Sequence, residues 1–227
     1  MTQGVVVGDL NLLELGLKRL GLSLTEGQKS ALLTYAQEFR KWNKIHNLSA
    51  IDEGDEFISL HLLDSLAVVS PLLLAHKKYS MPVHPVIADL GAGGGLPGIP
   101  LAIALPQWKF VLVEAVKKKA AFLQHIKGRL KLDNLEVVGQ RIELFSAAKP
   151  NFADATISRA FTELKNFVEF STPLLKSGGL VFAMKSQKAE EEISSLPQGW
   201  HVVGNDELTI PNLDAFRCLL TLQSVRK

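Results

Sequence analysis

A glycine-rich stretch at residues 86–101, VIADLGAGGGLPGIPL, constrains the fold more than any other part of the chain. It begins as a short apolar strand and continues through five glycines and two prolines. The prolines are compatible with a helix that begins near Leu96, because the first four N–H groups of a helix have no acceptor within it. A strand, a bare loop and a helix in this order can hold a small molecule at the carboxyl end of the strand. A turn that only packs strand on helix is the alternative, at a cost in backbone entropy.

The chain beyond Pro85 alternates between short β-branched runs and stretches of helical length. Strands are predicted at residues 86–89, 110–114, 135–138, 155–158 and 180–184, and helices at 117–130 and 163–175, the second ending at the KSGG sequence of residues 176–179. Two further strands, 200–209 and 217–225, follow one another without a helix, which predicts an antiparallel pair at the sheet edge. The fold class is therefore α/β, a mostly parallel, doubly wound sheet.

The first part of the chain has a helical pattern throughout. Apolar residues recur at helical spacing between residues 10 and 74, and Thr25 to Gln28 has the form of a capping box. We expect an N-terminal helical segment, residues 1–84, packed on a ligand-binding domain at 85–227. This segment either covers one face of the sheet or forms a platform for RNA, and we favour the cover.

Cysteine content and hydropathy bear on the compartment. Cys218 is the only cysteine, which allows no internal disulfide and fits a reducing environment. No run reaches the roughly 18 to 20 apolar residues that span a bilayer, and Asp9 and Glu14 interrupt the start where a signal peptide would be apolar. The sequence predicts a cytoplasmic protein with no membrane partner.

Two acidic residues bear on the ligand of the glycine loop. The glycines fit either a GxGxG spacing, Gly91, Gly93 and Gly95, or the dinucleotide GxGxxG spacing. Asp89 ends the first strand, where a carboxylate would repel a pyrophosphate but stabilise the cationic S-adenosylmethionine. Glu114 ends the second strand, where an acid can accept hydrogen bonds from ribose hydroxyls of either S-adenosylmethionine or NAD.

Basic residues suggest contact with RNA. The net charge is only +2, yet residues 109–131 hold seven basic residues against the single acid Glu114. Lys117, Lys118 and Lys119 begin a helix, where the helix macrodipole disfavours positive charge, so another interaction must favour lysine there. Contact with an RNA backbone and a solvated helix face are equal alternatives for this basic segment. Arg141 and Arg159 follow the third and fourth strands and could hold a phosphate or guanine O6, or be ordinary ion-paired arginines.

Six blocks in order carry a family resemblance: WNKIHNLSAI at 42–51, HLLDSL at 61–66, DLGAGGGLPGIPLAI at 89–103, KKKAAFL at 117–123, QRIE at 140–143 and SRAF at 158–161. With them the chain resembles the guanine-N7 methyltransferases of small-subunit (16S) ribosomal RNA, the RsmG or GidB family. The resemblance implies a Rossmann-like class I methyltransferase domain preceded by helices. It also implies methyl transfer from S-adenosylmethionine to N7 of a guanine.

The resemblance also assigns residues. It implies that Gly91, Leu96, Ile142, Glu143 and Arg159 contact the methyl donor, beside Asp89, Gly93, Gly95 and Glu114 of the loop analysis, and that Arg159 helps to orient the reactants. Lys185 and Arg217 are expected on the RNA side with Lys117, Lys118, Lys119 and Arg141. The chain departs from the family pattern at Ser186, where glycine is usual, and at Cys218, where histidine is common.

The reaction that the resemblance implies needs few catalytic groups. Guanine N7 has an exposed lone pair and no proton to remove, so we expect in-line displacement without a general base or a metal. His61 and Asp64, one turn apart, are interpreted as bonded to each other rather than to a metal. Asn47 and Ser49 either line the lid of the donor pocket or the RNA side, or are local helix caps, and we favour the caps. The expected partner of this monomer is 16S ribosomal RNA or the 30S subunit. An NAD-dependent oxidoreductase and a non-catalytic ribosome-assembly factor are the alternatives.

Overall fold

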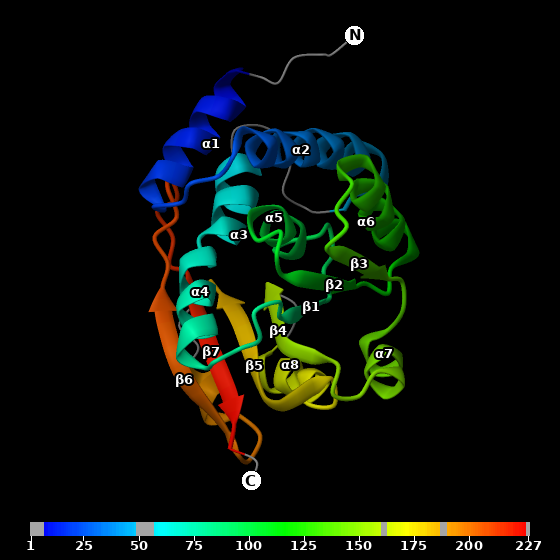
Figure 1. Cartoon of the computed structure of the whole chain (residues 1–227), viewed down its shortest axis with the longest axis vertical. Coiled ribbons are helices and arrows are strands. Elements are labelled where there is room, and N and C mark those ends of the chain that lie inside the picture. Colours follow the sequence, from blue (N-terminus) through cyan, green and yellow to red (C-terminus); the bar gives the residue numbers. More distant parts are fainter. Residues whose placement is uncertain (1–6, 49–56, 160–162, 187–189, 226–227) are drawn as a thin grey trace.

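The structure is a computed structural model that describes residues 7–48, 57–159, 163–186 and 190–225. Its centre is a seven-stranded sheet with the order β3-β2-β1-β4-β5-β7-β6 (Figure 1). The strands are β1 Val86–Leu90, β2 Lys109–Val113, β3 Leu135–Val138, β4 Ala153–Arg159, β5 Leu175–Lys185, β6 Trp200–Glu207 and β7 Cys218–Ser224. Strands β1 to β5 pair in parallel, and β7 is antiparallel to both β5 and β6. The predicted fold class, with its antiparallel edge pair, is confirmed.

Seven helices and helical turns cover one face of the sheet in the described parts of the chain. They are α1 Val7–Arg19, α2 Glu26–His46, the π-helix η1 Ile58–Leu63, α3 Asp64–Leu66, α4 Val69–Lys78, α5 Gly98–Ala104 and α6 Lys117–Leu130. The other face carries α7 Ile142–Ala148, α8 Leu164–Ser171 and α9 Glu190–Ser194. Figure 1 shows α2, α5 and α6 together on one side and α7 and α8 on the other.

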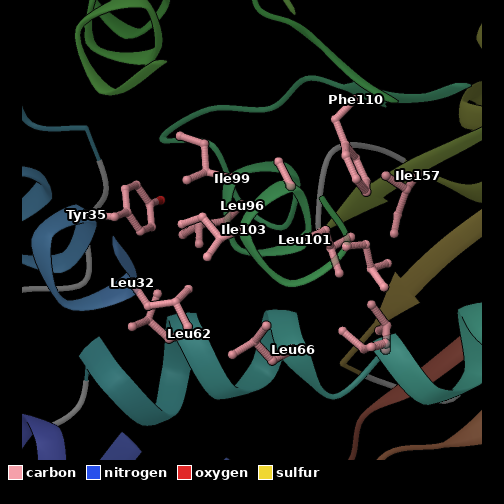
Figure 2. Close-up of a cluster of buried hydrophobic side chains, with 14 of the residues drawn as sticks. Leu32, Tyr35, Leu62, Leu66, Leu96, Ile99, Leu101, Ile103, Phe110 and Ile157 are labelled. Carbon is pink, nitrogen blue, oxygen red and sulfur yellow. The ribbon is translucent and has the colours of Figure 1, made fainter. Parts of the chain in front are cut away.

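Side chains of the strands alternate between two cores because successive residues of a strand point to opposite faces. In β1, Ile87 joins the core beneath α1 to α6, whereas Ala88 and Leu90 join the core beneath α7 and α8. The N-terminal helices belong to the first of these cores: Leu32, Leu62 and Leu66 lie with Leu101, Phe110 and Ile157 in Figure 2. The helical segment before Pro85 therefore buries its apolar face on the sheet.

Local sequence signals set several element ends. The capping box is confirmed, since the Thr25 hydroxyl accepts from the Gln28 backbone at 3.2 Å and the Gln28 side chain accepts from the Thr25 backbone at 2.9 Å. Asn47 is the C-cap of α2 in a left-handed conformation, so it is a local cap as predicted. Ser49, and residues 160–161 of the SRAF block, lie outside the described residues.

One helix is shorter than predicted. Helix α8 ends at Ser171, not near residue 175, because Pro173 has no N–H to continue it and Leu174 turns back to donate to the Ser171 carbonyl at 3.0 Å. The KSGG sequence at 176–179, predicted as the end of this helix, is instead the start of β5.

The chain also holds one apolar helical run that sequence inspection missed. Ile58–Lys78 spans 21 residues and contains an 18-residue window with a mean hydropathy of 1.8, which is long and apolar enough to cross a membrane by length and composition. In the structure 72% of that window is buried inside the protein, so the run has the surroundings of a core helix.

Candidate functional site

A cavity of about 650 Å³ opens at the carboxyl ends of β1, β2 and β4, which is the ligand-binding edge of a doubly wound sheet. Its volume lies within the range of small-molecule sites, about 300 to 1,000 Å³. Its lining comes from the glycine loop, the residues after β2, the start of α6 and α7, and α2. These residues are Phe39, Leu48, Gly91, Ala92, Gly93, Gly94, Leu96, Val113, Glu114, Ala115, Val116, Lys119, Arg141, Ile142, Glu143, Arg159 and Phe170.

The glycine loop folds tightly against the protein. Gly93 has φ +57° and lines the cavity, whereas Gly95, with φ +94°, does not. A Cβ on Gly95 would overlap Ile99, and one on Gly94 would overlap the Phe39 ring of α2. The loop therefore needs glycine for two reasons, a left-handed backbone and close packing, and Gly95 supports the site from beneath.

Most N–H groups of the loop are bonded within the described parts of the protein, the exception being that of Gly94. Those of Gly91 and Ala92 donate to the Val113 carbonyl at 3.0 and 3.2 Å. Those of Gly95 and Leu96 donate to the Ala92 carbonyl at 2.7 and 3.2 Å. A phosphate-binding loop presents such groups to its ligand instead.

The start of α5 is satisfied in the same way. The Gly98 N–H donates to Asp89 Oδ2 at 2.9 Å and the Ile99 N–H donates to the Gly95 carbonyl at 2.7 Å. Pro97 and Pro100 have no N–H to offer. An internal carboxylate thus takes the position at the helix start where a dinucleotide would place its pyrophosphate.

Asp89 lies beneath the loop and does not line the cavity. It is fully buried, and its Oδ1 has no hydrogen-bond partner among the described residues. Burial raises the pKa of Asp89 to about 7; the Gly98 N–H and Arg159 oppose this rise and Glu114 adds to it. The structure therefore gives Asp89 a contact with the loop and the helix start.

Glu114 lies in the cavity wall and braces the loop. Its Oε2 accepts from the Gly93 N–H at 2.8 Å and its Oε1 from the Val116 N–H at 2.7 Å. A carboxylate has about four lone-pair sites, so these two bonds leave acceptor capacity toward the cavity. That remaining capacity suits hydroxyl donors such as those of a ribose.

Arg159 extends from the end of β4 into the cavity wall and is tied to the N-terminal segment. Its Nη1 donates to Asp64 Oδ2 at 2.9 Å and to the Leu60 carbonyl at 3.0 Å, and its Nη2 lies 3.3 Å from His61 Nδ1. Asp64 Oδ1 accepts from Arg217 Nε at 3.0 Å. The expected bond between His61 and Asp64 is therefore wrong, because both Asp64 oxygens accept from arginines and His61 Nδ1 lies 3.0 Å from the Leu60 carbonyl.

The residues expected on the RNA side separate into two groups. Lys119 and Arg141 line the cavity, and Lys117 and Lys118 are exposed beside them at the start of α6. These four form an open basic rim. The other two are mostly buried and paired: Lys185 with Glu192 at 2.6 Å, and Arg217 with Asp64.

Sequence reasoning missed the part of the site that comes from the N-terminal segment. Phe39 and Leu48 line the cavity, and the Tyr35 hydroxyl donates to the Gly94 carbonyl at 2.7 Å. The segment is thus more than a cover for the sheet. Its only sequence signal was that residues 42–51 belong to the family blocks. Trp42 is half-buried at the edge of the first core, with its ring centroid 5.2 Å from that of His46 and 5.3 Å from that of His125.

The described ranges contain no cluster of three His, Cys, Asp or Glu side chains that could hold a metal ion.

Comparison with known proteins covers nearly the whole chain. The family model described as GidB, rRNA small subunit methyltransferase G, matches residues 28–220. A protein of Polynucleobacter asymbioticus named Ribosomal RNA small subunit methyltransferase G is 48% identical over 95% of this chain and 96% of its own length. One of the same name from Azoarcus sp. is 42% identical over 91% of this chain and 92% of its own.

Solved structures share the fold at low identity. The O-methyltransferase from Bacillus cereus in complex with SAH has a TM-score of 0.56 and 16% identity, covering 84% of this chain and 90% of that chain. The TYW2 protein of M. jannaschii in complex with AdoMet has a TM-score of 0.50 and 14% identity, covering 67% and 76%. At these identities the likeness concerns the fold alone.

Proposed function

The chain belongs to the rRNA small subunit methyltransferase G family, and from that membership we propose that it transfers the methyl group of S-adenosylmethionine to N7 of a guanine in 16S ribosomal RNA. Methylation of small-subunit ribosomal RNA follows from the family. The base, the atom and the residues that act are our proposal.

The cavity suits S-adenosylmethionine better than a dinucleotide. One observation carries this choice: the N–H groups of Gly91, Ala92, Gly93, Gly95 and Leu96 in the loop, and of Gly98 and Ile99 at the start of α5, are bonded inside the protein, so the loop has few donors to offer a pyrophosphate. S-adenosylmethionine has no phosphate, and it supplies an activated methyl group on a sulfonium. The NAD-dependent oxidoreductase is therefore disfavoured by the loop as well as by the family.

The donor is held, in this proposal, by residues of the cavity wall. Gly91, Gly93 and Leu96 allow its close approach to the loop, Glu114 accepts from its ribose hydroxyls, and Ile142 packs against it. Glu143 stands beside Ile142 in the first turn of α7, and Arg159 closes the wall from β4. Asp89 and Gly95 hold the loop in shape from beneath.

Methyl transfer needs alignment more than proton transfer. The N7 lone pair forms a bond to the methyl carbon, the carbon–sulfur bond breaks with its electron pair going to sulfur, and the positive charge moves to the guanine ring. The described residues that line the cavity include no histidine, and their two carboxylates, Glu114 and Glu143, have no proton to take from N7. The chain's contribution is therefore to hold the three atoms in line, which can lower a barrier by about 7 to 11 kcal/mol in well-oriented reactions.

The RNA approaches, we propose, over the basic rim of Lys117, Lys118, Lys119 and Arg141. Lys119 and Arg141 line the cavity, and Lys117 and Lys118 are exposed in the same turn of α6, so these side chains can contact phosphates near the target base. Lys185 and Arg217 lie at the same sheet edge but have carboxylate partners, so they are weaker candidates for RNA contact.

The test is transfer of labelled methyl from S-adenosylmethionine to unmodified 16S ribosomal RNA and to 30S subunits, followed by digestion to nucleosides. We expect label in 7-methylguanosine. Label in another nucleoside would contradict the N7 assignment and leave rRNA methylation intact. Donor binding without transfer to either substrate would favour the non-catalytic assembly factor.

A further inference from the structure

Two arginines at the same edge of the sheet, distant from each other in sequence, share one buried carboxylate. The Asp64 side chain is 3% exposed, and each of its oxygens accepts from a different guanidinium, Arg159 at the end of β4 and Arg217 beside the start of β7. The guanidinium side chains are 20% and 21% exposed. Because these three charged groups are mostly shielded from solvent, they interact strongly with one another. The cluster of Asp64, Arg159 and Arg217 has a net charge of +1.

The backbone beside Asp64 adds to the grip on Arg159. Asp64 directly follows the π-helix η1. Helices of this type are rare in proteins, and those that occur are often found at functional sites. Within η1 the Leu60 carbonyl accepts from the same Arg159 Nη1 that bonds Asp64. The neighbouring His61 ring is buried, and burial together with Arg159 lowers its pKa to about 4, so it adds no charge near neutral pH. Asp64 is therefore the anion in this cluster that balances Arg159.

This balance matters because Arg159 lines the cavity. A guanidinium in the wall repels a sulfonium placed nearby, and the repulsion is stronger where water is excluded. A carboxylate that is bonded to the guanidinium but does not itself line the cavity reduces that repulsion while leaving the arginine side chain in the wall.

Resting on the proposed function, we propose that Asp64 is a positioning residue of the methyl-transfer site: it holds Arg159 in the cavity wall and offsets its charge, so that a sulfonium is accepted there. A purely structural tie between η1 and the sheet would also use an Asp–Arg pair. The two roles differ in one respect, since a structural tie is indifferent to the charge of the ligand.

S-adenosylmethionine and S-adenosylhomocysteine separate these roles. They share the adenosine, the ammonium and the carboxylate, and differ in the methylated, positively charged sulfur. Isothermal titration of each ligand into the full chain gives a ratio of dissociation constants that isolates the sulfonium. In Asp64→Asn we expect the constant for S-adenosylmethionine to rise about tenfold and that for S-adenosylhomocysteine to stay within about twofold of wild type.

Three further variants keep the test decisive. Asp64→Glu retains the charge and should restore the ratio. In Arg217→Gln, Asp64 pairs with Arg159 only, so S-adenosylmethionine should bind more tightly relative to S-adenosylhomocysteine than it does in wild type. This variant gives a second measurement if Asp64→Asn does not fold. Asp154→Asn is the matched control, because Asp154 is also buried and pairs with Lys176 at 2.8 Å but does not line the cavity. It should change stability and leave the ratio unchanged.

The proposal is overturned if Asp64→Asn weakens both ligands by the same factor, or neither. Because these are binding measurements, they decide the role of Asp64 separately from catalysis. Wild-type protein that binds S-adenosylmethionine but methylates no 16S ribosomal RNA would contradict the proposed function, while the ratio would still decide this inference.

Discussion

The Tyr35 hydroxyl donates a 2.7 Å hydrogen bond to the backbone carbonyl of Gly94, which ties helix α2 to the glycine loop. Tyr35 is fully buried, and burial raises the pKa of its hydroxyl, so it stays a neutral donor. The bond joins two parts of the chain that differ in sequence character, the N-terminal helices and the loop that forms the cavity.

Tyr35→Phe removes this bond and leaves the Gly94 carbonyl without its donor. We expect the free energy of unfolding to fall by about 1 to 2 kcal/mol, and S-adenosylmethionine binding to weaken because the loop loses a brace. Tyr79→Phe is the matched control, since the Tyr79 hydroxyl also donates to a backbone carbonyl, that of Val203 at 3.1 Å, without lining the cavity. Equal loss of donor affinity in both variants would show that the brace is not specific to the loop. Denaturant titration and calorimetry provide the two measurements.

Gly94→Ala places a methyl group into the Phe39 ring. Overpacking of this kind costs about 1 to 3 kcal/mol, and here it would also displace a side chain of the cavity wall. The expected result is lower stability and weaker donor binding, both partly restored by adding Phe39→Leu. Gly128→Ala in α6 is the control, because a Cβ there meets nothing within 4 Å. It should be neutral or stabilise the helix by about 0.5 to 1 kcal/mol. Unchanged donor binding in Gly94→Ala would contradict the packing argument.

Charge reversal of Lys117 and Lys118 tests the basic rim. Glutamates at a helix start are favourable by about 0.3 to 1 kcal/mol each, so the double variant should fold at least as well as wild type. We expect weaker 16S RNA binding and a log–log salt dependence flatter by about 0.7 to 0.9 for each lost phosphate contact, with donor binding retained.

The same charge change at the other end of α6 is the control. Lys127→Glu with Arg129→Glu alters the net charge equally but lies in the last turn of the helix. If this pair reduces the salt slope as much as the first pair, the RNA contact is a general effect of net charge and the rim has no special part in it.

The pH dependence of stability follows from Asp89. Its pKa is raised from 3.8 to about 7 on folding, so between these values the native state holds a proton that the unfolded state releases. Stability contributed at this site therefore falls as pH rises from about 4 to 7 and is constant above about 8. Asp89→Asn cannot ionise, and its amide oxygen can still accept from Gly98.

The variant should therefore become more stable than wild type as pH rises. We expect the difference in unfolding free energy to grow by on the order of 2 to 3 kcal/mol between pH 5 and pH 8. The contribution of His61, whose pKa is lowered on folding, has the opposite sign but cancels in the comparison of the two proteins. If the difference in unfolding free energy between the variant and wild type does not depend on pH, the pKa of Asp89 is not raised on folding.

The sheet could be predicted from sequence because its signals are local. Helix α6 begins and ends where its apolar spacing predicts, at Lys117 and Leu130, and β3 coincides with residues 135–138. The predicted ends of helices and strands were wrong where a tertiary contact decides them. Helix α8 ends at Ser171 because the chain turns back at Pro173, and β5 begins earlier than predicted.

The site was harder to predict because its central contacts are long-range. Asp64 and its two arginine partners are 95 and 153 residues apart in sequence, and no spacing rule connects them. The overlap of Phe39 with any side chain at position 94 is likewise invisible without the fold. Asp89 is different, because side chains alternate between the two faces of a strand and Asp89 therefore lies on the same face of β1 as the buried Ile87, toward α5. This two-residue alternation alone could have predicted that Asp89 is buried.

The self-contained hydrogen bonding of the loop and of the start of α5 also bears on how this protein would respond to metabolism. A loop that keeps most of its backbone donors bonded internally binds phosphate weakly, so NAD, ATP and GTP are poor competitors for the site. The molecule that competes with the methyl donor is then its own product, which has the same adenosine and differs by one methyl group. Turnover would follow the ratio of donor to product, and so report on the methylation capacity of the cell rather than on its energy supply.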